Sequence, residues 1–162
     1  TRAMKGNPEV ISLLNEGLCA ELTAINQFFI HSKMNADWGY KTHEKKYYEE
    51  SIEEMKHAEN IIARLLFLEG VPNMQKYHKI MVGATVPEQY QHDLKLEMDA
   101  VEIYNRAVKK CVEVGDNASR SLFEGLLVDE EDHVDWIETQ LHAIGEIGLE
   151  NYLAQKLGEE KE

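Results

Sequence analysis

The feature that most constrains this sequence is an internal repeat of acidic residues and histidines. A Glu-x-x-His segment, Glu54–His57, recurs 76 residues later as Glu130–His133. The same offset relates Glu21 to Glu97, and each of these glutamates precedes its Glu-x-x-His segment by 33 residues. Each half of the chain therefore presents the same three residues at the same spacing.

The spacing within each segment has a specific chemical meaning. Residues i and i+3 lie on one face of an α-helix, so a glutamate and a histidine at this spacing can reach the same metal ion. Buried without compensation, four carboxylates would be very costly, so metal ions or protons must accompany them. Mixed oxygen and nitrogen ligation suits iron or manganese, with zinc as an alternative. The predicted ligands of a two-metal site are Glu21, Glu54, His57, Glu97, Glu130 and His133.

Apolar residues recur at helical spacing in four long segments and one short one. The first begins at Asn7-Pro8, where an N-capping residue precedes a proline at the first helical position. The expected helices cover residues 7–37, 42–69, 87–114, 118–144 and 149–157.

The connections between these segments predict the topology. Short turns join the helices within each half, whereas a long stretch with Pro72 and Gly83 separates the halves. This pattern indicates two antiparallel hairpins joined by one crossover. We therefore expect an all-α chain with a single domain over residues 1–162. It would comprise an N-terminal extension (1–6), an antiparallel four-helix bundle (7–144) and a short fifth helix (149–157).

Composition and charge exclude several classes of protein. Hydrophobic residues make up 43% of the chain and charged residues 29%, which is typical of a globular protein. A formal net charge of −13 argues against nucleic-acid binding, because nothing would offset the repulsion from phosphates. No apolar run approaches the ~20 residues of a membrane span, and no secretory signal pattern is present. Cys19 and Cys111 lack the spacing of ligands or of a disulfide framework, so we expect reduced thiols in a cytoplasmic protein.

Four stretches resemble the ferritin-like di-iron family and, more closely, its haem-containing branch, the bacterioferritins. They are residues 21–27, 50–58, 66–70 and 129–136. The resemblance implies the same six ligands, with Glu54 and Glu130 bridging two irons and each histidine paired with a terminal glutamate. It also implies iron storage and detoxification by a ferroxidase, which oxidises Fe(II) to Fe(III) with O2 or H2O2. The product would mineralise inside a hollow homo-oligomeric cage of twenty-four subunits.

Met55 breaks the symmetry of the repeat, since its counterpart is Glu131. It follows Glu54 directly and therefore points about 100° away from the metal site. The resemblance implies that Met55 binds haem iron axially, together with the same residue of a twofold-related subunit. Haem would then carry electrons from a small ferredoxin to release stored iron. The other haem-pocket residues implied are Leu22, Ile25, Asn26, Phe29, Tyr48, Ile52 and Lys56.

The sequence departs from the family at two positions that concern electron transfer. Phe28 stands where some bacterioferritins carry a tyrosine, and a phenyl ring cannot donate an electron as a phenol can. Glu49 stands where some members carry a histidine that helps to hold iron on the inner surface of the cage, alongside the position of Glu53. Electron delivery from stored iron is therefore expected to differ here.

Other interpretations remain open from the sequence. A di-iron or di-manganese enzyme could act on peroxide without storing iron, as rubrerythrin or manganese catalase does, although the chain lacks the cysteine cluster of rubrerythrin. A haem-free ferritin would use Met55 for packing alone, and a purely structural bundle would leave the site empty. A second type of subunit could also join the cage. The remaining histidines lack partner spacing and are expected at the surface or in hydrogen bonds; they are His31, His43, His78, His92 and His142.

Overall fold

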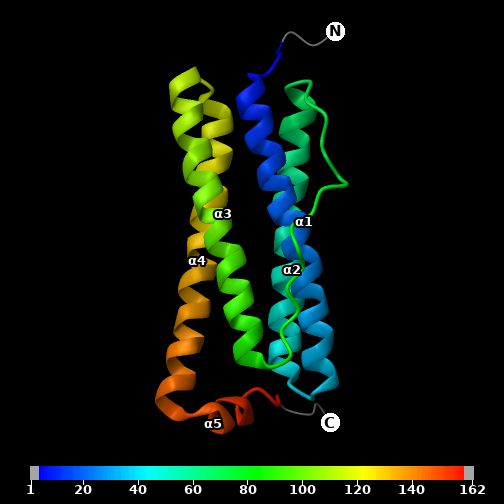
Figure 1. Ribbon diagram of the computed structural model, residues 1–162, viewed down its shortest axis with the longest axis vertical. Coiled ribbons are helices and arrows are strands. Elements are labelled where there is room, and N and C mark those ends of the chain that lie inside the picture. The colour runs from blue at the N-terminus through cyan, green and yellow to red at the C-terminus, as the bar shows by residue number, and fades with distance from the viewer. Residues whose placement is uncertain (1–3, 159–162) are drawn as a thin grey trace.

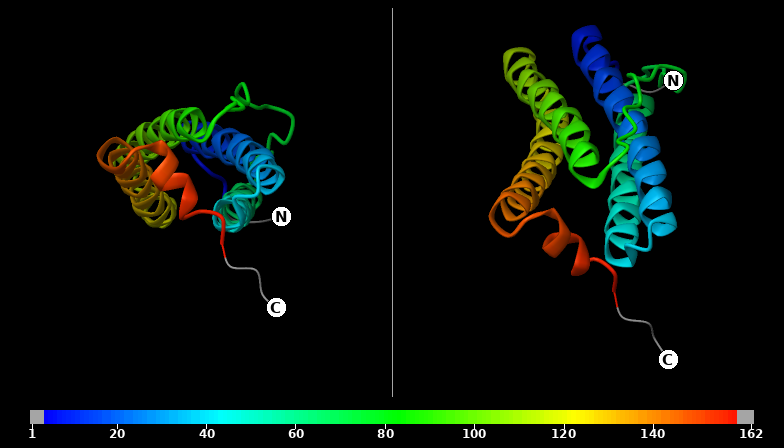
Figure 2. Two further views of the ribbon diagram at one scale, coloured as in Figure 1. Left: turned by 90° about the horizontal axis from the view of Figure 1, so that it is seen from below. Right: turned by 60° about the horizontal axis from the view of Figure 1, so that its bottom comes forward.

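The computed structural model describes residues 4–158 and contains five helices over that range. They are α1 (Pro8–Asp37), α2 (Lys41–Phe67), α3 (Val86–Val114), α4 (Asn117–Ile147) and α5 (Leu149–Ala154). α1 and α2 form one antiparallel hairpin, α3 and α4 form the other, and α5 lies across the lower end of the bundle (Figure 1). Seen from below, the four long helices surround a common axis (Figure 2). The predicted all-α bundle with a short fifth helix is confirmed.

Side-chain caps mark the start of three of the four long helices, α1, α3 and α4. Asn7 accepts a hydrogen bond from the backbone N–H of Glu9 at 2.9 Å, and Thr85 and Asp116 cap α3 and α4 in the same way. The starts lie close to those predicted. Of the N-terminal extension expected at residues 1–6, residues 1–3 lie outside the described range.

The end of the bundle differs from the prediction by three residues. α4 continues to Ile147 instead of stopping at residue 144, because Gly145 adopts helical geometry at a cost of only about 1 kcal/mol. The chain leaves the helix at Gly148, whose φ of +82° lies in a region that favours glycine. α5 then ends at Ala154 rather than at residue 157.

The connection between α2 and α3 runs along α1 and is held to it by polar side chains. Asn15 accepts from the N–H of Asn73 at 2.8 Å. Farther along, Thr23, Gln27 and His31 accept from the backbone N–H groups of residues 78, 81 and 83 at 3.0 Å each. These bonds satisfy donors of an irregular segment that would otherwise be unpaired. The segment is the crossover that the sequence predicted.

Two hydrophobic clusters fill the bundle on either side of its centre. One includes Leu14, Ile61, Tyr104 and Phe123, and the other includes Phe28, Tyr47, Tyr90 and Tyr152. Along every long helix, the acidic residues and histidines of the repeat lie between the positions that belong to these clusters. Within the described residues, no helix combines the length and apolar character needed to cross a membrane.

Candidate metal centre

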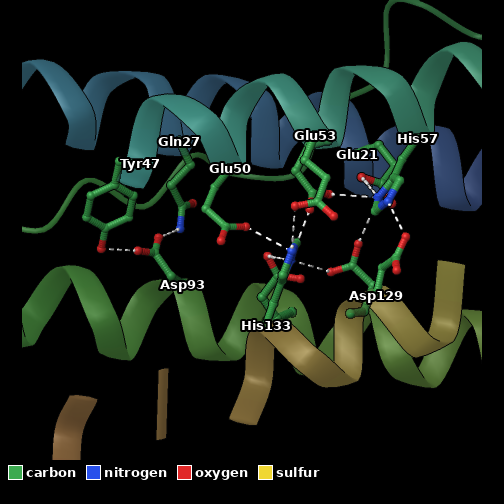
Figure 3. A network of polar contacts seen from close by, with 12 residues as sticks. Glu21, Gln27, Tyr47, Glu50, Glu53, His57, Asp93, Asp129 and His133 are labelled. Carbon is green, nitrogen blue, oxygen red and sulfur yellow. Dashed lines mark hydrogen bonds and ion pairs between the residues drawn. The ribbon is translucent and has the colours of Figure 1, made fainter. Parts of the chain in front are cut away.

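All six repeat residues meet at the centre of the bundle. α1 supplies Glu21 and α3 supplies Glu97, while α2 and α4 each supply one Glu-x-x-His segment. Every one of the six is buried, with exposed fractions between 1% and 8%. Figure 3 shows His57 and His133 pointing between the helices toward the surrounding carboxylates.

The six residues form two overlapping groups of four. One group contains Glu21, Glu54, His57 and Glu130, and the other contains Glu54, Glu97, Glu130 and His133. Within each group, one potential ligand atom from every residue lies within 4.8 Å of the others. Glu54 and Glu130 belong to both groups, which is the arrangement that two bridged metal ions require.

The contacts of the two histidines follow an approximate twofold symmetry. His57 Nδ1 lies 3.5 Å from Glu21, 3.3 Å from Glu130 and 3.6 Å from Glu54. His133 Nδ1 lies 3.5 Å from Glu97, 3.2 Å from Glu54 and 3.6 Å from Glu130. The corresponding distances agree within 0.1 Å, so both halves of the centre offer nearly the same ligand geometry.

Several buried atoms of these residues have no hydrogen-bond partner among the described residues. They include Nδ1 of both histidines and at least one carboxylate oxygen of each of the four glutamates. Buried polar atoms are normally paired, because an unpaired one costs about 1–3 kcal/mol. Four carboxylates and two imidazoles directed at one centre form a donor set suited to iron or manganese.

The carboxyl groups of the centre differ in the direction of their pKa shifts. Burial raises the pKa of Glu21 and Glu54, and the charge of Glu130 raises it further. Burial alone would also raise the pKa of Glu130, but its contacts with His133 and His57 lower it to about 2. The metal-free centre therefore keeps protons on some of its carboxyl groups.

The pKa values of both histidines are also raised. Burial alone would lower the pKa of His57, but contacts with Glu130, Glu21 and Glu54 outweigh it and raise the pKa above the ordinary value. The pKa of His133 is raised in the same way, by Glu130, Glu50 and Glu54. Protons on the two histidines would balance the charge of the carboxylates, and metal ions would displace those protons.

A second ring of carboxylates orients the histidines, and the sequence interpretation missed this role. His57 Nε2 lies 2.9 Å from Asp129, and His133 Nε2 lies 2.9 Å from Glu50 and 3.2 Å from Glu53. A hydrogen-bonded Nε2 leaves Nδ1 as the metal-directed atom. The 76-residue offset also relates Glu53 to Asp129, so the repeat itself contained a signal for this pair.

The expected haem-pocket residues lie on α1 and α2. Met55 is 51% exposed, which rules out a role as a core filler. Phe29 and Tyr48 are each 47% exposed, and the amino group of Lys33 lies over both rings. The remaining members range from buried to exposed and are Leu22, Ile25, Asn26, Ile52 and Lys56.

Phe28 is buried in the cluster with Tyr47, and Glu49 is exposed on α2 near Lys45. His31 and His43 are buried and hydrogen-bonded, to Asp93 and Asn35 respectively. None of the five remaining histidines belongs to a group of potential ligands among the described residues.

The bundle and its central carboxylate–histidine cluster define a protein of the ferritin-like class. Residues 11–147 match the family model described as the ferritin-like domain. A bacterioferritin of Mycolicibacterium paratuberculosis is 44% identical over 152 residues, covering 94% of this chain and 96% of that protein. The bacterioferritins of Rhodobacter capsulatus and Brucella melitensis are 47% and 46% identical over 149 residues, covering 92% of each chain. The chain therefore belongs to the bacterioferritin family.

Proposed function

We propose that this protein is a ferroxidase that oxidises ferrous iron at the six-residue centre and stores the ferric product in a cage of twenty-four subunits. Family membership supports iron storage as the general function. The observation that carries the ferroxidase proposal is the pair of overlapping ligand groups that share Glu54 and Glu130.

The charge of the centre suits two ferrous ions as substrate. Four carboxylates balance the four positive charges of two Fe(II) ions, with His57 and His133 as neutral ligands. Each iron gives one electron, so two irons and two protons reduce O2 to H2O2, or H2O2 to two waters. Oxidation leaves two positive charges unbalanced, which favours departure of the product toward nearby acidic groups. Glu53 and Asp129, both partly exposed beside the histidines, are proposed as the first of these.

Two substitutions test the role of the centre. Glu130→Ala removes a carboxylate that belongs to both groups, and His133→Ala removes the nitrogen ligand of one group. Each is expected to slow the first oxidation of two irons per subunit at least about tenfold, as measured by stopped-flow absorbance. His142→Ala, at an exposed lone histidine, is the control. Wild-type rates in both centre variants would rule out this site as the ferroxidase.

We further propose that Met55 binds haem between two copies of the chain. The half-exposed thioether of Met55 provides a soft iron ligand, and the exposed rings of Phe29 and Tyr48 lie on the same two helices, α1 and α2. Haem bound there would supply a route for electrons, and a small ferredoxin is the proposed donor. Leu22, Ile25, Asn26, Ile52 and Lys56 would complete the pocket.

The haem proposal has a spectroscopic test. The reduced protein reconstituted with haem should show the absorption spectrum of bis-thioether ligation, and Met55→Leu should abolish it. Met98→Leu, at a methionine on α3 that is 54% exposed, is the matched control. An unchanged spectrum in the Met55 variant would exclude Met55 as the ligand, whereas a wild type that binds no haem would favour a haem-free ferritin.

A second candidate function is a peroxide-consuming di-iron or di-manganese enzyme without storage. The same ligand groups favour it, and iron uptake separates the two functions. We also propose a cytoplasmic location, because the free cysteines Cys19 and Cys111 are both buried and suit a reducing compartment.

A further inference from the structure

The two halves of the metal centre differ in the residues that contact the terminal glutamates, Glu21 and Glu97. In the half formed by Glu21 and His57, the Tyr104 hydroxyl donates a hydrogen bond to Glu21 Oε1 at 2.5 Å. Glu21 Oε2 faces His57 Nδ1 and has no hydrogen-bond partner among the described residues. Tyr104 therefore holds one oxygen of Glu21 and leaves the other directed at the metal centre.

The surroundings of Tyr104 fix its position. The ring is fully buried and lies 6.0 Å from the ring of Phe123. Gly17 on α1 makes room for it, because a Cβ at Gly17 would lie 2.9 Å from Tyr104 Cε1. The phenol therefore packs between α1 and α4, and this packing keeps its hydroxyl in contact with Glu21.

In the Glu97–His133 half of the centre, the corresponding ring pair carries its hydroxyl on the other ring. The 76-residue offset relates Tyr104 to Phe28 and Phe123 to Tyr47. Phe28 and Tyr47 also form a ring pair, with centroids 6.2 Å apart. The Tyr47 hydroxyl donates to Asp93 at 2.6 Å instead of to the terminal glutamate.

Glu97 consequently lacks the partner that Glu21 has. Its Oε1 faces His133 Nδ1 unpaired, just as Glu21 Oε2 faces His57, but no hydroxyl group among the described residues donates a hydrogen bond to Glu97. A cavity of about 20 Å³ lies beside it, lined by Phe28, Tyr47, Glu50, Asp93, Glu97 and His133 among others. Such a volume is large enough for one water molecule.

We propose that the two metal positions are functionally inequivalent. The Glu21–His57 half, fixed by Tyr104, is the tight position. The Glu97–His133 half is the weaker and exchangeable position, where Glu97 can change its orientation and the cavity by Phe28 takes a small oxygen ligand such as water. This inference rests on the proposed metal centre and assigns distinct roles to its halves.

The test measures binding of Zn²⁺, which undergoes no redox chemistry, by isothermal titration calorimetry of the assembled protein. The wild type is expected to bind two ions per subunit in steps of different affinity. Phe28→Tyr places a hydroxyl into the cavity next to Glu97 and should tighten the weaker step about tenfold. Tyr104→Phe should weaken the tighter step about tenfold and leave the other nearly unchanged.

Tyr90→Phe is the matched control, since it removes a buried hydroxyl that contacts His43 and Tyr152 and no residue of the centre. It should leave both steps as in the wild type. Two equal steps in the wild type, or equal effects of Tyr104→Phe on both, would overturn the inequivalence while leaving the metal centre intact. Absence of Zn²⁺ binding in the wild type would overturn the centre itself.

Discussion

At the scale of single residues, the metal-free centre keeps its charges balanced with protons. The pKa of Glu21 and Glu54 is raised by burial and by neighbouring carboxylates, and the pKa of both histidines is raised by their carboxylate contacts. Carboxyl groups and histidines with a raised pKa retain their protons to a higher pH than usual. A metal ion binds only to the deprotonated forms, so it must displace these protons.

Metal binding should therefore release protons and weaken as the pH falls. We expect Zn²⁺ binding near pH 7 to release more than one proton per subunit. Calorimetric titrations in buffers of different ionisation enthalpy measure this number directly. Glu54→Gln removes one of the protonated carboxyl groups and should reduce the release. An enthalpy that is independent of the buffer would contradict the protonation described here.

The ligand positions could be predicted from the sequence because their signal is a spacing. Two Glu-x-x-His segments at one offset suffice to place six side chains on facing helices. The roles of Tyr104 and Glu50 could not be predicted in this way, since each contacts a residue of another helix and has no matching partner in the repeat. Their contacts depend on how side chains pack, which the periodicity of the sequence does not specify.

At the scale of elements, several polar residues of α1 are explained by the crossover. Asn15, Thr23, Gln27 and His31 contact backbone groups of the segment between α2 and α3. The sequence predicted the long connection but gave no indication of its course, because its partners are backbone atoms of an irregular segment. The starts of α1, α3 and α4 were predicted well because capping residues are local signals. The end of α4 depended on whether the chain leaves the helix at Gly145 or at Gly148.

The short helix α5 buries Tyr152 against the bundle. Its hydroxyl donates to Gln140 at 2.7 Å and also contacts Tyr90 and His43. The side chain is only 3% exposed, although α5 has just six residues. A helix this short has little stability of its own, so its position depends on this contact.

Tyr152→Ala should therefore detach α5 while leaving the long helices folded. Removal of a buried aromatic ring costs about 3 kcal/mol, which would lower the free energy of local opening of α5 by a similar amount. Amide hydrogen exchange resolved by segment measures this loss. Leu157→Ala, at a residue 51% exposed just beyond α5, is the control and should change protection little. Unchanged protection of α5 in the Tyr152 variant would show that other contacts hold it.

At the scale of the whole molecule, α1 and α2 carry an apolar surface that the described chain leaves uncovered. Phe29, Tyr48 and Met55 are each about half exposed. The same three residues belong to the proposed haem pocket, which requires a second copy of the chain. A twofold interface on this face would bury these side chains and complete the pocket, so assembly and haem binding are expected to be coupled.

Disrupting this face should break the proposed cage. The wild type is expected to form a particle of about twenty-four subunits by light scattering and to take up many more than two irons per subunit. Phe29→Glu would place a charge in the twofold interface, where burial without a partner is costly, and should give smaller species. Those species should still bind about two metal ions per subunit, because the centre lies inside each bundle.

Val112→Glu, at a residue 53% exposed on α3, is the matched control for an added surface charge and should leave the particle intact. A wild-type particle no larger than a dimer, with iron uptake that stops near two per subunit, would exclude storage and favour the peroxide-consuming alternative. An intact cage in the Phe29 variant would instead show that the twofold contact lies elsewhere, and the haem pocket on α1 and α2 would then lose its second half. Particle size and iron capacity measured on the same samples thus separate the assembly, the storage function and the position of the interface.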